Sequence, residues 1–231
     1  MINYFRYKST NNFKTFENLN NKLLLDKIIP NRKNINILII DDEASFLPEK
    51  LKQLNYTNVK CISNYTDTSE IDKYQVILCD IENVGKEIHI KKQGFAVYQQ
   101  LKKLYPNKII CLYTAHNPED YGELCDDCIV INKPIQTSEL VDLLDMYTER
   151  FWKPEVAWEY ISKTCIDKGA TFKYLAILED MFVRSFNKNT INIYEKVSNK
   201  YKKNNTMSEY IGVGLEVLTI LLKIAPGFLK I

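Results

Sequence analysis

The chain has 231 residues, of which 45% are hydrophobic and 26% are charged, and its formal net charge is +2. A chain of this length and apolar content can bury one or two cores, and the +5 carried by the 82 residues 150–231 is well short of a strong nucleic-acid-binding footprint. The charge is unevenly spread, because residues 35–149 carry a net −8 and each flanking segment carries +5. The basic flanks could attract nucleic acid, anionic lipid or an acidic partner, or could dock on the acidic segment between them.

Residues 1–34 form an N-terminal extension with no catalytic pattern. Aromatic and polar residues alternate at its start, and a short helix is expected over residues 19–29, where Pro30 ends it. We expect this extension to pack as an arm on another element.

Four short apolar runs follow, at residues 35–40, 74–79, 108–113 and 128–132. Helix or loop patterns separate them, and uninterrupted apolar runs of this length are typical of parallel strands buried on both faces. The segment 35–148 is therefore predicted to be an α/β domain with a doubly wound parallel sheet. In such sheets the ligand site lies outside the carboxyl ends of the strands.

Polar residues stand directly after these runs, where they would converge at one edge of the sheet: Asp41, Asp42, Asp80, Thr114 and Lys133, the last followed by Pro134. Three carboxylates make a hard, oxygen-rich site that suits Mg²⁺. Asp80 follows the central strand and is the natural nucleophile toward a phosphoryl donor. The Thr114 hydroxyl and the Lys133 ammonium would each contact a phosphoryl oxygen.

In order, strand context and spacing, these residues resemble the receiver domain of two-component response regulators. The family pattern is an acidic pair, a phosphoacceptor Asp, a Thr or Ser, and a Lys-Pro. The resemblance implies a five-stranded flavodoxin-like sheet over about residues 35–148. It also implies that Asp41, Asp42 and Asp80 bind Mg²⁺ together with the backbone carbonyl of Glu82. Asp80 would accept the phosphoryl group from a histidine kinase, a phosphotransfer protein or an acyl phosphate and lose it slowly, Thr114 would report it and Lys133 would bridge to it.

Three features depart from the family pattern. The segment 80–94 is longer than the usual loop, so a flap rich in Lys86, Lys91 and Lys92 could cover the site. Val130 stands where the family often has an aromatic switch residue, and Tyr113 is a candidate substitute. The stretches between Asp42 and Asp80 and between Thr114 and Lys133 are short, which predicts stunted second and fourth helices.

Residues 149–231 read as a helical output or dimerisation domain. Pro154 suits the first turn of a helix, a break is expected at residues 167–169, and residues 171–186 carry a core-facing apolar stripe that begins at Phe172. Residues 191–203 repeat the pattern with a lysine-rich face, which raises a DNA-reading helix as an alternative to a solvated surface.

The most apolar segment of the chain is 207–231. Glu209, Glu216, Lys223 and Lys230 recur in it every seven residues, so one side of the helix is charged, and Pro226 cuts the helix short of the length that a membrane span needs. We therefore expect it to pack in a bundle or homodimer, with a membrane anchor as the disfavoured alternative. The nine apolar residues that would need cover are Ile211, Val213, Leu215, Val217, Leu218, Ile220, Leu221, Leu222 and Ile224.

The six cysteines show no disulfide-framework spacing, and the N-terminus lacks the apolar core of a signal peptide, so reduced thiols in a cytoplasmic protein are expected. The motif Cys125-x-x-Cys128 stands alone, and we interpret it as packing rather than as a zinc or redox site. The sequence thus predicts a response regulator that signals through a helical domain. The alternatives are a DNA-binding transcriptional regulator and a scaffold whose receiver takes no phosphate.

Overall fold

The structure is a computed structural model, and it describes residues 13–15, 32–43, 46–65, 71–188, 190–193, 196, 199 and 205–224. The chain divides into two compact units, Asn31–Thr148 and Glu149–Ile231 together with Met1–Pro30. The helix predicted over residues 19–29 lies outside the described residues, as does most of the lysine-rich segment 191–203. Among the described helices, none has the length and apolarity to cross a membrane.

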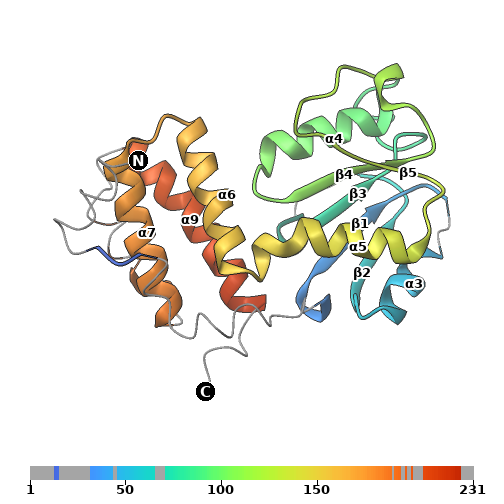
Figure 1. The fold of residues 1–231 in the computed structure, drawn as a ribbon. Helices are drawn as coiled ribbons and strands as arrows, with labels where there is room; N and C mark the ends of the chain where they lie inside the picture. The colour runs from blue at the N-terminus through green and yellow to red at the C-terminus, as the bar shows by residue number, and fades with distance from the viewer. Residues whose placement is uncertain are drawn as a thin grey trace. The chain divides into compact units, whose positions relative to one another are not determined.

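The unit Asn31–Thr148 is built on a five-stranded parallel sheet in the order β2-β1-β3-β4-β5 (Figure 1). The strands are β1 Asn36–Ile40, β2 Asn58–Ile62, β3 Val76–Cys79, β4 Ile109–Thr114 and β5 Ile129–Asn132. This strand order is the flavodoxin-like one, in which ligands bind where the order reverses, between β1 and β3. The predicted fold class of this unit is confirmed.

Helices cover both faces of the sheet. Figure 1 shows α4 on one face, and α3 and α5 on the other. Their bounds are α3 Leu47–Gln53, α4 Gln93–Leu104 and α5 Thr137–Thr148. The other two crossovers hold, in their described residues, only the 3₁₀ turns η3 Ile71–Lys73 and η4 Pro118–Asp120. The fourth helix is therefore stunted as expected, whereas the place of the second includes residues 66–70, which lie outside the described part of the chain.

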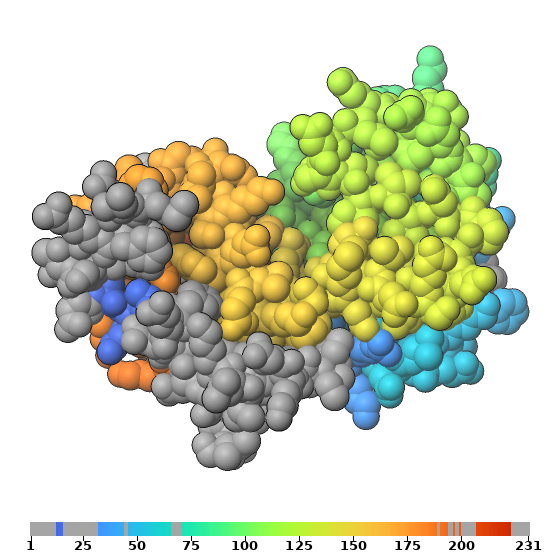
Figure 2. Space-filling model, in the orientation of Figure 1, coloured from blue at the N-terminus to red at the C-terminus, as the bar shows by residue number. Residues whose placement is uncertain are grey.

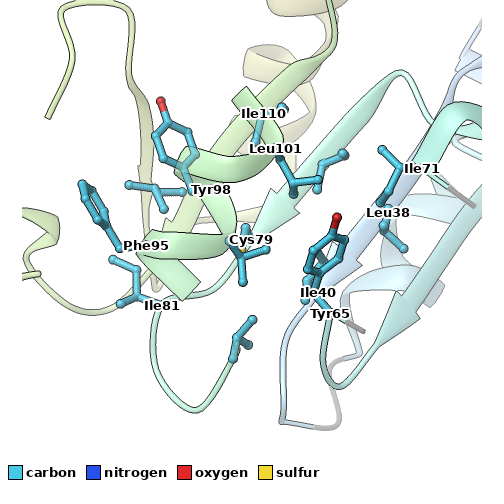
Figure 3. Packing of buried hydrophobic residues seen from close by; sticks show 14 of the residues in the cluster. Leu38, Ile40, Tyr65, Ile71, Cys79, Ile81, Phe95, Tyr98, Leu101 and Ile110 are labelled. Atoms are coloured by element: carbon cyan, nitrogen blue, oxygen red, sulfur yellow. The ribbon is translucent and has the colours of Figure 1, made fainter. Parts of the chain in front are cut away.

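The core between the sheet and α4 consists of alternate strand residues packed against one face of the helix (Figure 3). Its members include Leu38, Ile40, Ile77, Cys79, Ile110, Leu112, Phe95, Tyr98 and Leu101. The intervening strand residues, such as Ile37 and Leu78, are fully buried on the opposite face, where α3 and α5 lie. Burial on both faces explains why the central strands are continuously apolar.

The second unit contains three long helices that contact one another, α6 Pro154–Asp167, α7 Phe172–Asn187 and α9 Asn205–Ile224, after the 3₁₀ turn η5 Glu149–Phe151 (Figure 1). Pro154 occupies the first turn of α6, and Gly169, at φ +85°, lies in the predicted break before α7. The α7 stripe is buried from Leu175 to Phe186, but Phe172 at the start of the helix is 55% exposed, contrary to its predicted place in the core.

Candidate functional site

Two carboxylates are fixed at the carboxyl ends of the neighbouring strands β1 and β3. Asp41 and Asp80 each directly follow a strand, and both are buried. The Asp80 amide donates to the Ile40 carbonyl at 2.8 Å, which continues the pairing of the two strands. Asp80 Oδ1 accepts from the Ile81 amide at 2.7 Å and Asp41 Oδ1 accepts from the Glu43 amide at 3.1 Å. The backbone therefore orients both carboxylates and leaves their Oδ2 atoms for another partner.

That partner is Lys133, which directly follows β5. Its Nζ donates to Asp41 Oδ2 at 2.7 Å and to Asp80 Oδ2 at 2.9 Å, and it lies 4.8 Å from the ring centroid of Tyr113. The bond between Lys133 and Pro134 is cis. Burial acts to lower the pKa of the Lys133 ammonium, but the hydrogen bonds to Asp41 and Asp80 outweigh it and leave the pKa raised. Lys133 is therefore a permanent cation between the two carboxylates at neutral pH.

Thr114 completes the cluster from β4. It is fully buried at the end of the strand, and its hydroxyl oxygen accepts from the His116 amide at 3.1 Å. The Thr114 carbonyl accepts from the Lys133 amide at 2.8 Å, so the ends of β4 and β5 are joined. Because the hydroxyl accepts in this contact, its proton can be donated to another group.

The carboxylates of Asp41, Asp42 and Asp80 offer one oxygen each within 4.8 Å of one another, and in the described chain they are the one group of three or more such ligands. Asp42 is exposed, whereas the other two are buried. Such a set of oxygen ligands beside solvent fits Mg²⁺, which takes one or two carboxylates and keeps several waters. The sequence-predicted carbonyl ligand, that of Glu82, lies two residues beyond Asp80, and its role stays a prediction.

The chain is similar, at low identity, to several solved structures. No known protein family and no curated protein matches the sequence. Among solved structures, the response regulator DrrB, an OmpR/PhoB homolog from Thermotoga maritima, is 18% identical with a TM-score of 0.35, over 52% of this chain and 55% of that one. The chain thus spans about half the length of DrrB.

Two other solved structures extend the comparison. The response regulator RcsB, solved with DNA, is 20% identical with a TM-score of 0.39, over 83% of this chain and 93% of that one. A Burkholderia pseudomallei response regulator, solved with a phosphorylated aspartic acid, calcium and citrate, is 16% identical with a TM-score of 0.33, over 68% and 93%. The strand order by itself gives residues 31–148 the flavodoxin-like fold, which receiver domains share with other proteins.

Sequence reasoning missed one pair at this edge of the sheet. His116 Nε2 lies 2.6 Å from Glu82 Oε2, and both side chains are roughly half exposed. The pair joins the residue two beyond Thr114 to the residue two beyond Asp80, so it links the loops that leave β4 and β3. Both residues stand in loops shortly after strands that carry site residues, and that proximity was the available signal.

The segment from Asp80 to Gly94 is a series of turns whose lysines do not contact the cluster. Lys86 donates to the Asn83 side chain at 2.5 Å, and Lys91 is exposed. Asn64 holds the segment on the β2 side, because its Oδ1 accepts from the Gly85 amide at 2.8 Å and its Nδ2 donates to Glu87 at 2.9 Å. The described contacts therefore do not support the predicted lysine flap over the site.

Proposed function

We propose that this protein is a response regulator that accepts a phosphoryl group on Asp80. The observation that carries the proposal is the position of Lys133 Nζ, which lies within hydrogen-bonding distance of both Asp41 and Asp80, while Thr114 is buried at the end of the neighbouring strand β4. One nucleophilic carboxylate, one fixed cation and one hydroxyl on adjacent strand ends are the groups that phosphoryl transfer requires.

The chemistry assigned to these residues is a simple displacement. An oxygen of Asp80 attacks the phosphorus of a phosphohistidine or acyl phosphate donor, the bond from phosphorus to the donor breaks, and an acyl phosphate forms on Asp80. The Lys133 ammonium can then exchange its bond to the carboxylate for one to a phosphoryl oxygen. Thr114 can donate a hydrogen bond from its hydroxyl to another phosphoryl oxygen. Phosphorylation of Asp80 would thereby change a contact at the end of β4.

Asp41, Asp42 and Asp80 would hold Mg²⁺, with the Glu82 carbonyl as the fourth protein ligand. A bound Mg²⁺ supplies charge neutralisation for the phosphoryl oxygens. The protein's own contribution is to bury the carboxylates of Asp41 and Asp80 and to orient them with backbone amides.

Phosphorylation of the full chain by acetyl phosphate tests the proposal. We expect one acid-stable, base-labile phosphoryl group per chain in the presence of Mg²⁺, and none after Asp80→Asn or with a chelator. Asp72→Asn is the matched control, because Asp72 is an exposed aspartate on η3, before β3. Equal incorporation into the Asp80→Asn variant would show that the phosphoryl group resides elsewhere and the assignment is wrong.

We further propose that the unit formed around α6, α7 and α9 passes the phosphorylation state to a partner or to a second copy. The DNA-binding alternative depends on the lysine-rich segment 191–203, which lies mostly outside the described residues. Salt-dependent retention of the chain on DNA would favour that alternative. Partner binding that is the same before and after Asp80→Asn would favour an unphosphorylated scaffold.

A further inference from the structure

Cys125 and Cys128 occupy the first and fourth positions of a hydrogen-bonded turn just before β5. The Cys128 amide donates to the Cys125 carbonyl at 2.9 Å, and residues 126 and 127 form the turn between them. The first and fourth Cα atoms of such a turn lie within about 7 Å, which overlaps the range of about 4.4 to 6.8 Å that a disulfide requires. The backbone therefore already holds the two cysteines at a separation that a disulfide can bridge.

Both sulfur atoms face the same side of this turn. Cys125 Sγ lies 3.6 Å from the hydroxyl of Tyr98. Burial raises the pKa of this hydroxyl, and the Cys128 thiol lies close enough to contribute to the rise. Tyr98 is a buried residue of α4, and one helical turn later Lys102 pairs with Asp127, which lies between the two cysteines. Two contacts with one helix thus fix the turn, with both thiols beside the same hydroxyl.

Cys125 differs from the other five cysteines in access to solvent. Cys125 is exposed and Cys128 is half-buried, whereas Cys79, Cys111 and Cys165 are buried and Cys61 is half-buried within strand β2. The segment between β4 and β5 forms part of the surface seen in Figure 2. The interpretation of this motif as packing is therefore wrong for Cys125, because its side chain lies in water.

Metal binding does not explain the pair. Zinc takes four nitrogen, sulfur or carboxylate ligands, or three when it is catalytic. Within the described part of the chain, the cluster of three or more potential ligands is the one at Asp41, Asp42 and Asp80. Two thiols without further ligands, adjacent in one turn and accessible from one side, suit two-electron oxidation instead.

We propose that Cys125 and Cys128 are a reversible thiol–disulfide site that a hydroperoxide oxidises. The Cys125 thiolate attacks hydrogen peroxide, the O–O bond breaks, and the products are a sulfenic acid and water. The Cys128 sulfur then attacks the Cys125 sulfur, so the S–S bond forms as the S–O bond breaks and a second water leaves. Two thiols have lost two electrons and two protons, and one peroxide has become two waters. A dithiol reverses the bond by exchange.

The site is separate from the proposed phosphoacceptor. Strand β5 begins directly after Cys128 and ends directly before Lys133, so the thiol pair and the ammonium lie at opposite ends of the same strand. Oxidation at one end does not use any group of the acidic cluster. The inference can therefore fail or succeed independently of the phosphorylation of Asp80.

A thiol count on the full chain tests the proposal. The reduced protein is treated with hydrogen peroxide, the excess is removed with catalase, and the thiols are titrated after unfolding. We expect the count to fall from six to four and to return to six with dithiothreitol, and mass spectrometry should find the peptide with Cys125 and Cys128 unalkylated and lighter by two hydrogens.

Three variants make the test specific, and circular dichroism checks that each is folded. Cys61→Ser is the matched control, because it removes a half-buried thiol elsewhere and should still lose two thiols. Cys125→Ser should lose none, and Cys128→Ser should lose one, which dimedone captures as the sulfenic acid. The proposal is overturned if six thiols remain in the wild type, if the bond joins other cysteines or two chains, or if Cys125→Ser loses as many thiols as the wild type.

Discussion

Gly94 lies so close to Asp80 that a Cβ atom placed on it would come within 1.8 Å of the Asp80 carbonyl oxygen. The Gly94 amide donates to the Ile81 carbonyl at 2.9 Å, so the first turn of α4 is joined directly to the segment that leaves β3. The glycine therefore allows the helix and the strand end to approach closely. Because glycine has no side chain, α4 can pack this closely against the segment that contains Asp80.

Gly94→Ala should destabilise the unit Asn31–Thr148, because the new methyl group meets backbone atoms, which cannot move aside as a side chain can. We expect a loss of about 2 to 3 kcal/mol in the free energy of unfolding, at the upper end of the usual cost of overpacking. Gly212→Ala is the control, since Gly212 is an exposed position in α9 where a Cβ meets no described atom within 4 Å. That change should be neutral or stabilising by up to about 1 kcal/mol. Equal effects of the two changes would contradict the close approach.

A second prediction concerns Asp145 in α5, which accepts hydrogen bonds from two other elements. Arg32 contacts both of its carboxylate oxygens at 2.5 to 3.2 Å, and the buried Tyr56 hydroxyl donates to it at 2.7 Å. Asp145→Asn removes the charge that pairs with Arg32, and we expect it to lower the free energy of unfolding by about 1 to 3 kcal/mol. Asp142→Asn, an exposed position on the same helix, should stay within about 0.5 kcal/mol of the wild type.

Hydrogen exchange is the suitable measurement for both predictions. The two tryptophans, Trp152 and Trp158, belong to the unit that contains α6, α7 and α9, so their fluorescence does not report on the unfolding of the unit Asn31–Thr148. Amides of β1 and β3 should exchange faster in Asp145→Asn by about 5- to 160-fold, the factors that correspond to a loss of about 1 to 3 kcal/mol in stability. Unchanged exchange in these strands would mean that the Arg32 contacts contribute nothing.

The central sheet could be predicted from sequence because burial on both faces leaves an uninterrupted apolar run. Three of the four predicted runs match β1, β3 and β4 within two residues, and the fourth matches the edge strand β5. Strand β2 has no such run in its sequence, because it is the other edge strand. Three of its five residues are half-buried and two are exposed. Edge strands need less apolar sequence, so their positions follow only from the fold.

The positions of the acidic residues, Thr114 and Lys133 could be predicted for the same reason, since each lies at the carboxyl end of a strand or within two residues after it. Pairs of residues that loops and helices bring together could not be predicted from the sequence. Arg32 and Asp145 are far apart in sequence, and neither stands in a pattern that singles out the other. The His116–Glu82 pair depends on how two loops leave the sheet, which strand periodicity does not describe.

Association through α9 stays a prediction. Five of its nine apolar residues are buried by the chain itself, which are Ile211, Val213, Val217, Leu218 and Leu221, so fewer remain for a partner than the sequence suggested. Leu215 and Leu222 are partly exposed, two helical turns apart on one side. We expect the full chain to sediment as a homodimer and Leu222→Lys to shift it toward monomer, whereas the exposed Glu216→Gln should not. A wild-type chain that is monomeric at every concentration would contradict this.

The last prediction is that Lys133 and Mg²⁺ offset the same repulsion. Without a metal ion, the Lys133 ammonium is the cation that hydrogen-bonds to both Asp41 and Asp80. Lys133→Met leaves these buried carboxylates facing each other, and with a chelator present we expect a loss of about 1 to 3 kcal/mol in stability.

Adding Mg²⁺ should then stabilise the Lys133→Met variant more than the wild type, because the variant's site carries one more uncompensated negative charge and binds the ion more tightly. Lys102→Met is the control, since it removes a lysine that pairs with the exposed Asp127 and should change neither stability nor the Mg²⁺ response by more than about 0.5 kcal/mol.

Because the pKa of Lys133 is raised in the folded chain, the contribution of its ammonium to stability is fully present below about pH 10.4 and is lost as the pH rises further. Chemical unfolding at neutral pH, with and without Mg²⁺, therefore measures the whole effect. An identical Mg²⁺ response in the wild type and the Lys133→Met variant would show that the ammonium and the ion do not share the site.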